Sequence, residues 1–395
     1  MGFVFTVGLF FLFQYGLVLA LLWGLNRPWW QVAWVRRTAL WTPLAGLLSG
    51  VIWRAGTHLE LNLLVFAGLG VVAGLSLCLA GLLVALLLTG LVHAAEWTHD
   101  RWHHPQAPSP ERRHLLRCGL VVVPALSTLT AGGGMIASAT PAHIPRIDLN
   151  FPELPAPLAG LKILQLSDIH IGPYIRLSHL DALLGRAGDL GADLVLVTGD
   201  LCDDMPVFAQ TLRLLEQLRP SLGVYACLGN HEHFRGLRRI KEHFAVSGIR
   251  LLVNEGVGLD RGGASLYLGG TDDPRTLRSP ASYELLRRYV ERSLAGTATG
   301  AFRVLMSHRA QALDYAAPLG VELVLAGHTH GFQLGYQGRS FFESWMPERY
   351  PWGLYRQGPT QLYTSAGVGH WFPFRLGCPP EAPLFTLRRA NPLPA

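Results

Sequence analysis

The stretch Leu161–His170, LKILQLSDIH, places an Asp-x-His pair directly after a short apolar run. The run has the length and composition of a buried β-strand. Four later apolar runs are also followed by polar motifs, which are Gly199-Asp200, Gly229-Asn230-His231-Glu232, Ser307-His308 and Gly327-His328-Thr329-His330. Amphipathic stretches lie between several runs, at Leu177–Leu190, Val207–Leu218, Leu237–Val246 and Tyr283–Leu294. This alternation predicts an α/β domain with a largely parallel core.

The five motifs form a candidate metal site. Ligand groups of α/β sheets gather on loops beyond the carboxyl ends of the strands, where each motif is expected to lie. Each motif alone is typical of a turn, but together they supply five histidines, two aspartates and an asparagine. Such a set suits manganese, iron or zinc, and two cations ~3.5–4 Å apart are the arrangement that hydrolyses phosphate esters.

In this order, D-x-H, G-D, G-N-H-E, S-H and G-H-T-H, the motifs resemble those of the calcineurin-like metallophosphoesterase superfamily. Two further stretches, Gly270–Pro274 and Gly367–Glu381, resemble its bacterial membrane-anchored branch. The resemblance covers about residues 161–390 and implies a four-layer α/β/β/α sandwich. Two divalent metal ions are implied, the first bound by Asp168, His170, Asp200 and His330, and the second by Asp200, Asn230, His308 and His328.

The resemblance also implies a mechanism, which is in-line attack of a metal-bound hydroxide on phosphorus. Asp200 and His231 are the expected catalytic residues. Asp200 bridges the two metals, and His231 is not a ligand but stabilises the transition state or protonates the leaving oxygen.

Several residues depart from the family pattern or add to it. Phe332 stands where a second glycine is usual, and we expect it to narrow the mouth of the site. His233 and His370 are either walls of the pocket or substrate contacts. Arg309 and Arg375 are either phosphate-binding cations or solvated loop residues.

Residues 1–140 are rich in Leu, Val, Ala, Gly and Trp and predict a transmembrane anchor of about four helices. The expected spans are Phe3–Leu25, Ala39–Trp53, Leu61–Val92 and about Cys118–Ala139. A signal peptide is the alternative for the first span, but no basic segment precedes it and no small-residue cleavage site follows. A hairpin is the alternative for the third span. No Asp, Glu, Lys or Arg lies inside these runs, which favours an anchor over a transporter.

The arginines predict the orientation of this anchor. They cluster after the first and third spans, at Arg27, Arg36 and Arg37 and at Arg101, Arg112, Arg113 and Arg117. The positive-inside rule then places the catalytic domain on the extracytoplasmic side of the cell (inner) membrane. Residues 141–160 contain five prolines and predict a semi-rigid linker, followed by the metallophosphoesterase domain at 161–395.

Charge and cysteine content exclude other classes of function. The net charge is +6, and no long Lys/Arg stripe with aromatics is present, so no nucleic-acid partner is expected. Five cysteines without a CxxC motif indicate neither a zinc ribbon nor a disulfide framework.

We therefore expect a membrane-anchored phosphoesterase that hydrolyses a phosphomonoester, phosphodiester or pyrophosphate bond of a lipid or envelope substrate. The apolar stretch Phe341–Met346, with Trp352 and Tyr355 after it, is either a membrane-dipping or acyl-binding flap or an insertion packed on the domain. One alternative function is hydrolysis of a nucleotide-linked lipid A precursor at the inner leaflet, which needs the opposite topology. Another is a non-catalytic sensor or scaffold. The presence of Asp200, Asn230 and His231 argues against that alternative.

Overall fold

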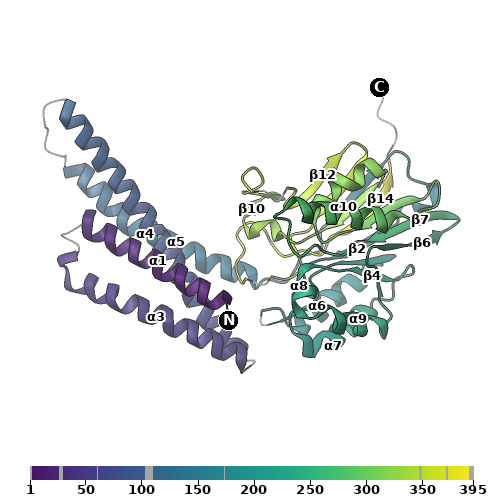
Figure 1. The fold of residues 1–395 in the computed structure, drawn as a ribbon, viewed down its shortest axis with the longest axis horizontal. Coiled ribbons are helices and arrows are strands. Elements are labelled where there is room, and N and C mark those ends of the chain that lie inside the picture. The colour runs from purple at the N-terminus through teal and green to yellow at the C-terminus, as the bar shows by residue number, and fades with distance from the viewer. Residues whose placement is uncertain are drawn as a thin grey trace. The chain divides into compact units, whose positions relative to one another are not determined.

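The computed structural model in Figure 1 divides the chain into two compact units, Met1–Ile136 and Ala137–Ala395. It describes residues 2–25, 30–59, 61–102, 110–172, 174–346, 349–370 and 372–390.

Long helices make up the first unit, namely α1 (Gly2–Leu25), α3 (Ala33–His58), α4 (Asn62–Trp102) and α5 (Pro110–Ser138). Helix α4 packs against α1 and α3. Among the described residues, two segments are long and apolar enough to cross a membrane, Gly70–Ala95 and Cys118–Ser138. In the described part of the chain, four helices thus form where four spans were expected. Only two of them contain a segment that is long and apolar enough to cross a membrane. The hairpin alternative for the third span is wrong, because α4 runs through its glycines without a break.

Two six-stranded sheets form the second unit. The first has the order β1 (Arg146–Phe151), β14 (Leu384–Arg389), β2 (Lys162–Leu166), β3 (Leu194–Thr198), β4 (Val224–Cys227), β5 (Arg250–Leu251). The second has the order β12 (Gly353–Gln357), β13 (Thr360–Thr364), β9 (Leu323–Ala326), β8 (Phe302–Met306), β7 (Ala264–Gly270), β6 (Glu255–Arg261). Both sheets are mixed, because the expected parallel strands are joined by antiparallel pairs at β14–β2, β12–β13 and β6–β7.

The main apolar core lies between the two sheets. Leu194 and Leu196 of β3 share one cluster with Val304 and Met306 of β8, and alternate residues of each strand face the opposite side. Helices cover those outer faces (Figure 1): α6 (Leu177–Gly188), α7 (Phe208–Glu216) and α9 (Leu237–Ala245) lie on the first sheet, and α10 (Pro280–Leu294) lies on the second.

The segment 141–160, expected to be a linker, belongs to the folded unit. Its residues Arg146–Phe151 form β1, which pairs in parallel with β14 along its whole length. Leu149 and Phe151 are buried in the core between the sheets. The flanking prolines are compatible with this role because β1 is an edge strand.

Candidate metal centre

The structure brings together all seven residues predicted as metal ligands. They occupy the loops after the central strands of both sheets. Asp168 and His170 follow β2, Asp200 follows β3, Asn230 follows β4, His308 follows β8, and His328 and His330 follow β9. The carboxyl ends of parallel strands meet at one edge of a sheet, so the two packed sheets present their loops to the same site.

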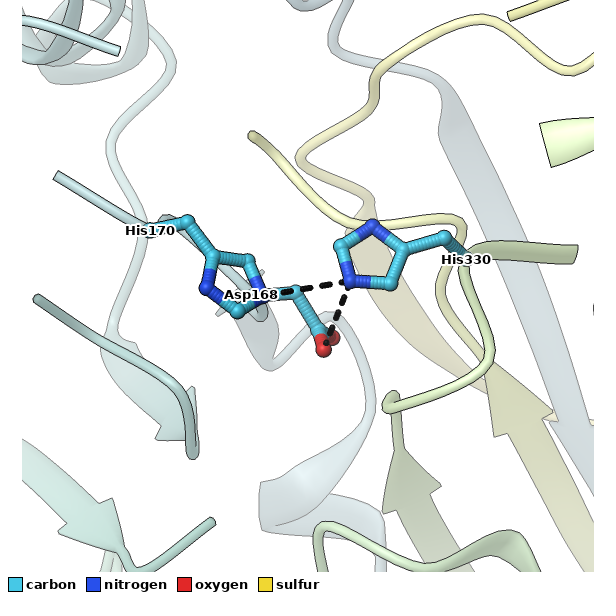
Figure 2. Close-up of side chains that lie close together, drawn as sticks. All are labelled: Asp168, His170 and His330. Carbon is cyan, nitrogen blue, oxygen red and sulfur yellow. Dashed lines mark hydrogen bonds and ion pairs between the residues drawn. The ribbon is translucent and has the colours of Figure 1, made fainter. Parts of the chain in front are cut away.

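Asp168, His170 and His330 form the first group of donor atoms (Figure 2). Nε2 of His330 lies 3.3 Å from Oδ1 of Asp168 and 3.2 Å from Nε2 of His170. Metal–ligand bonds of about 2.0–2.2 Å bring neighbouring donor atoms to roughly such separations. Two imidazole nitrogens that face each other this closely therefore suit a shared cation.

Asp200 connects this group to a second one. Its Oδ2 lies 3.6 Å from Nε2 of His170 and 3.3 Å from Nε2 of His308. The same His308 nitrogen lies 3.1 Å from Nδ1 of His328 and 3.1 Å from Oδ1 of Asn230. One carboxylate oxygen thus lies between two sets of donors, which is the position of a shared ligand.

The backbone is unusual at five of the residues predicted as ligands. Left-handed φ angles between 49° and 78° occur at Asp168, His170, Asp200, His328 and His330. Such angles are uncommon outside glycine and concentrate at functional sites. The glycines of the motifs provide room, because a Cβ at Gly229 would lie 2.2 Å from Oδ1 of Asp200. A Cβ at Gly327 would lie 2.1 Å from Oδ2 of Asp168.

Hydrogen bonds fix the orientation of two of the imidazoles predicted as ligands. Nδ1 of His308 lies 2.9 Å from the Thr198 carbonyl oxygen, and Nδ1 of His170 lies 3.0 Å from Oδ2 of Asp203. In each case Nδ1–H donates to the oxygen, which leaves Nε2 to bind a cation.

Asp203 is a site residue that the sequence reasoning missed. Besides His170, it contacts Nδ1 of His231 at 2.6 Å and Nε of Arg235 at 3.2 Å. Its position three residues after Asp200 could have marked it as a site residue. The sequence could not distinguish it from Asp204, which is the next residue and also an acid. Only the folded loop shows which of the two acids turns towards the histidines.

The electrostatics of the cluster fit divalent cations. Burial lowers the pKa of His170, but Asp203 and Asp200 outweigh it and raise the pKa to about 9. Burial also lowers the pKa of His308, which Asp200 nevertheless raises to about 10. Burial favours a neutral Asp200, yet His308 and His231 hold its pKa well below the usual range. Buried carboxylates that stay ionised need positive charge beside them. Metal ions bound by this donor set can supply that charge.

Both arginines considered as phosphate-binding cations are buried. Arg309 forms an ion pair with Asp273, with 2.6 Å between Nε and Oδ2, and also contacts His328. Arg375 is fully buried and donates to the main-chain carbonyls of Ala366, Gly369 and Cys378. Neither arginine is a solvated loop residue, and both terminal nitrogens of Arg375 donate to main-chain carbonyls.

The two additional histidines both contact other side chains of the domain. Nε2 of His233 lies 2.7 Å from Oδ1 of Asp272, and both side chains are largely buried. His370 is buried, and its ring stacks on Tyr174 with 5.9 Å between the ring centroids. Each imidazole therefore already has a neighbour within the domain.

Comparisons with known proteins agree with this geometry. The family model described as calcineurin-like phosphoesterase matches residues 161–332. An uncharacterized metallophosphoesterase of Aquifex aeolicus is 30% identical over 235 residues, or 58% of this chain and 85% of that protein. The phosphodiesterase YaeI of Escherichia coli is 29% identical over 239 residues, or 58% of this chain and 83% of that protein.

A longer alignment links the chain to a membrane protein. The "transmembrane protein with metallophosphoesterase domain" of Bos taurus is 29% identical over 299 residues, or 71% of this chain and 64% of that protein. The chain spans 62% of the length of the relative of the same name from Danio rerio, which is also 29% identical.

Proposed function

We propose that this chain, which belongs to the calcineurin-like phosphoesterase family, is a metal-dependent phosphoesterase. Two divalent metal ions, of manganese, iron or zinc, would be held by the seven converging side chains. Asp168, His170, Asp200 and His330 would hold one, and Asp200, Asn230, His308 and His328 would hold the other. The observation that carries the proposal is the position of Asp200 Oδ2 between the donors of both groups.

His231 has the geometry of a proton-transfer residue. Its side chain is partly exposed, and its Nε2 lies 3.9 Å from Oδ2 of Asp200, at the edge of the ligand cluster. Its Nδ1–H donates to Oδ1 of Asp203, which orients the ring. When bound, the metal ions would activate water and offset the charge on the phosphoryl oxygens. We assign to Nε2 of His231 the delivery of a proton to the leaving oxygen.

The proposed substrate is a phosphorylated molecule at a membrane surface, such as a phospholipid, lipid pyrophosphate or envelope glycolipid. The two apolar helical segments and the transmembrane relatives support a membrane-anchored chain. The name of the Escherichia coli relative supports a phosphodiester bond as the one hydrolysed. We further propose a four-helix anchor in residues 1–140 of the cell membrane, with an extracytoplasmic catalytic domain, from the distribution of arginines.

The test is hydrolysis by the full chain in detergent, with manganese added. Bis-p-nitrophenyl phosphate and p-nitrophenyl phosphate are compared, because their ratio separates diester from monoester chemistry. Asp200→Asn should abolish both activities and lower the content of both metals, since it removes the shared ligand. Asp181→Asn, a substitution on the exposed surface of α6, is the matched control and should behave as the wild type. Full activity of Asp200→Asn would refute the proposed site.

A second variant separates proton transfer from metal binding. His231→Ala should lower turnover by about 10²–10⁴-fold, which is the usual contribution of a general acid. Its metal content, measured by elemental analysis, should stay near that of the wild type. A loss of metal in this variant would make His231 a ligand and overturn its assigned role.

A further inference from the structure

A flap of exposed apolar side chains lies next to the metal-binding loop. It consists of the hairpin β10 (Gly335–Tyr336) and β11 (Arg339–Ser340) and the turn that continues to Met346. Tyr336, Phe341 and Trp345 are 64%, 60% and 82% exposed. We propose that the tip of this flap inserts into the headgroup region of the bilayer that anchors the chain. The inference rests on the proposed membrane-surface function and adds the surface through which the domain meets the lipid.

The base of the flap is firmly attached to the domain. The amide of Gly335 donates to the Leu376 carbonyl at 3.0 Å, and the amide of Phe341 donates to the Leu334 carbonyl at 3.1 Å. Phe342 turns inward and meets the ring of Phe332 edge-on, with 5.8 Å between the ring centroids. Phe342 therefore packs on the domain, whereas the side chains of Phe341 and Trp345 are exposed.

Phe332 connects the flap directly to the metal-binding loop. It follows the ligand His330 by two residues and has a left-handed φ of 52°. That conformation is unfavourable for an aromatic residue, and the related motif usually has glycine at this position. Strain of this kind persists only where neighbouring structure enforces it. Phe332 contacts Phe342 here, so the flap packs directly against the metal-binding loop.

The connection from the membrane helix to the domain is short. Helix α5 ends at Ser138, and the carbonyl of Ala142 already accepts a hydrogen bond from Arg186 at 2.6 Å. Four residues span at most about 14 Å. The next residue, His143, donates its amide to the Pro380 carbonyl at 3.0 Å. If α5 crosses the bilayer, the domain is therefore held at the membrane surface.

This connection reaches the domain close to the metal centre. Glu381 directly follows Pro380, the partner of His143. The amide of Glu381 donates to the Gly367 carbonyl at 3.0 Å. A Cβ at Gly367 would lie 2.9 Å from Cβ of Asp168 and 3.0 Å from Nδ1 of His330. The chain that leaves the membrane thus docks one loop away from two proposed metal ligands. If α5 crosses the bilayer, this attachment point favours the bilayer as the partner of the flap.

The composition of the flap fits insertion into a lipid interface. Trp and Tyr side chains favour the boundary between headgroups and hydrocarbon, because each joins an apolar ring to a polar group. The charges beside them are balanced, since Arg339 pairs with Glu343 at 2.8 Å and Arg349 pairs with Asp314 at 3.0 Å. The contact should therefore depend on apolar insertion and change little with ionic strength.

The experiment measures the depth of the flap in the full chain reconstituted into phosphatidylcholine vesicles. Cys78→Ala and Cys118→Ala remove the half-buried thiols, and the other three cysteines are buried. Trp345→Cys and, separately, Phe341→Cys receive an environment-sensitive fluorophore. The matched control is Val246→Cys, a site 87% exposed directly after α9, which Figure 1 draws well away from β10.

The expected result is a loss of fluorescence at positions 345 and 341 with nitroxide-labelled lipid, and little loss with aqueous iodide. Position 246 should show the reverse. Equal iodide quenching at 345 and 246 would overturn the proposal. Protection at 345 from both quenchers would also overturn it, because the tip would then contact protein, either a second copy or another part of this chain.

Hydrolysis of bis-p-nitrophenyl phosphate by the same vesicles separates this inference from the proposed function. Lipid quenching without hydrolysis would support the docking of the flap and refute the catalytic proposal. Hydrolysis without lipid quenching would support the catalytic proposal and refute the docking of the flap.

Discussion

The carboxylate of Asp203 contacts both a proposed metal ligand and the proposed proton donor. One of its oxygens orients the proposed ligand His170, and the other orients the proposed proton donor His231. Burial raises the pKa of Asp203, but the two histidines outweigh it and hold the pKa far below the usual range. The carboxylate is therefore ionised throughout the physiological pH range. A change at this residue would disturb metal binding and proton transfer together.

His370 should make the stability of the domain sensitive to acid. Burial, with Arg375 beside it, holds the pKa of His370 well below the usual value. Below about pH 6.5 the unfolded chain binds a proton at this residue that the folded chain does not, so stability falls as pH falls. The loss is at most about 1.4 kcal/mol per pH unit. His370→Phe keeps a ring against Tyr174 and should flatten this dependence.

Thermal unfolding between pH 7.5 and pH 5 measures this effect. His243→Phe, at a half-buried histidine on α9, is the control for the exchange of an imidazole for a phenyl ring. If wild type and His370→Phe lost stability in parallel as the pH fell, His370 would not be the group responsible.

The edge strands explain why the folded domain is larger than the motifs suggest. Strand β1 lies at one edge of the first sheet and pairs with β14, which is more than 230 residues away in the sequence. Strand β6 lies at the edge of the second sheet and has a polar, glycine-containing sequence, EGVGLDR. Neither segment has the continuous apolar pattern of the central strands, because an edge strand is less enclosed. Both were absent from the predicted elements.

Phe151→Ala should show that β1 is an integral part of the domain. Phe151 is buried between the sheets and meets Phe302 edge-on at 5.0 Å. Its truncation should cost about 3–5 kcal/mol, as for other buried phenylalanines. Asn150→Ala is the control, since that side chain is exposed and its main-chain carbonyl keeps the hydrogen bond from Gln361. Equal denaturation midpoints for the two variants would show that β1 contributes little to folding.

The two units of the molecule have different sources of stability. The first consists of apolar helices, whereas the second encloses a core between two sheets and a cluster of buried ionisable groups at one edge. Metal ions bound at that cluster stabilise the folded form by mass action. They should act on the second unit alone, so a single melting temperature would not describe the whole chain.

Removal of metal should therefore lower one thermal transition and leave the other in place. At a free metal concentration about a hundred times Kd, binding contributes about 2.7 kcal/mol per site. Calorimetry of the full chain with manganese and after chelation measures the shift. Asp200→Asn is the control, because it should melt at the same temperature in both conditions. An equal shift in that variant would mean that the metal acts elsewhere on the chain.

The sequence alone identified the side chains that converge at the metal centre and the α/β class of the domain. It could do so because each motif directly follows a strand, and strand ends in such sheets meet at one edge. The helical stretches Leu177–Leu190 and Leu237–Val246 likewise match α6 and α9, since amphipathic periodicity is a local property.

The tertiary structure decided the features that depend on contacts between distant segments. It selected Asp203 as the partner of His170 and His231. It buried Arg375 among backbone carbonyls and drew β1 into the first sheet. It also separated Phe342, which packs inward, from the exposed Trp345. A side chain's environment is set by what folds against it, and that partner lies elsewhere in the sequence.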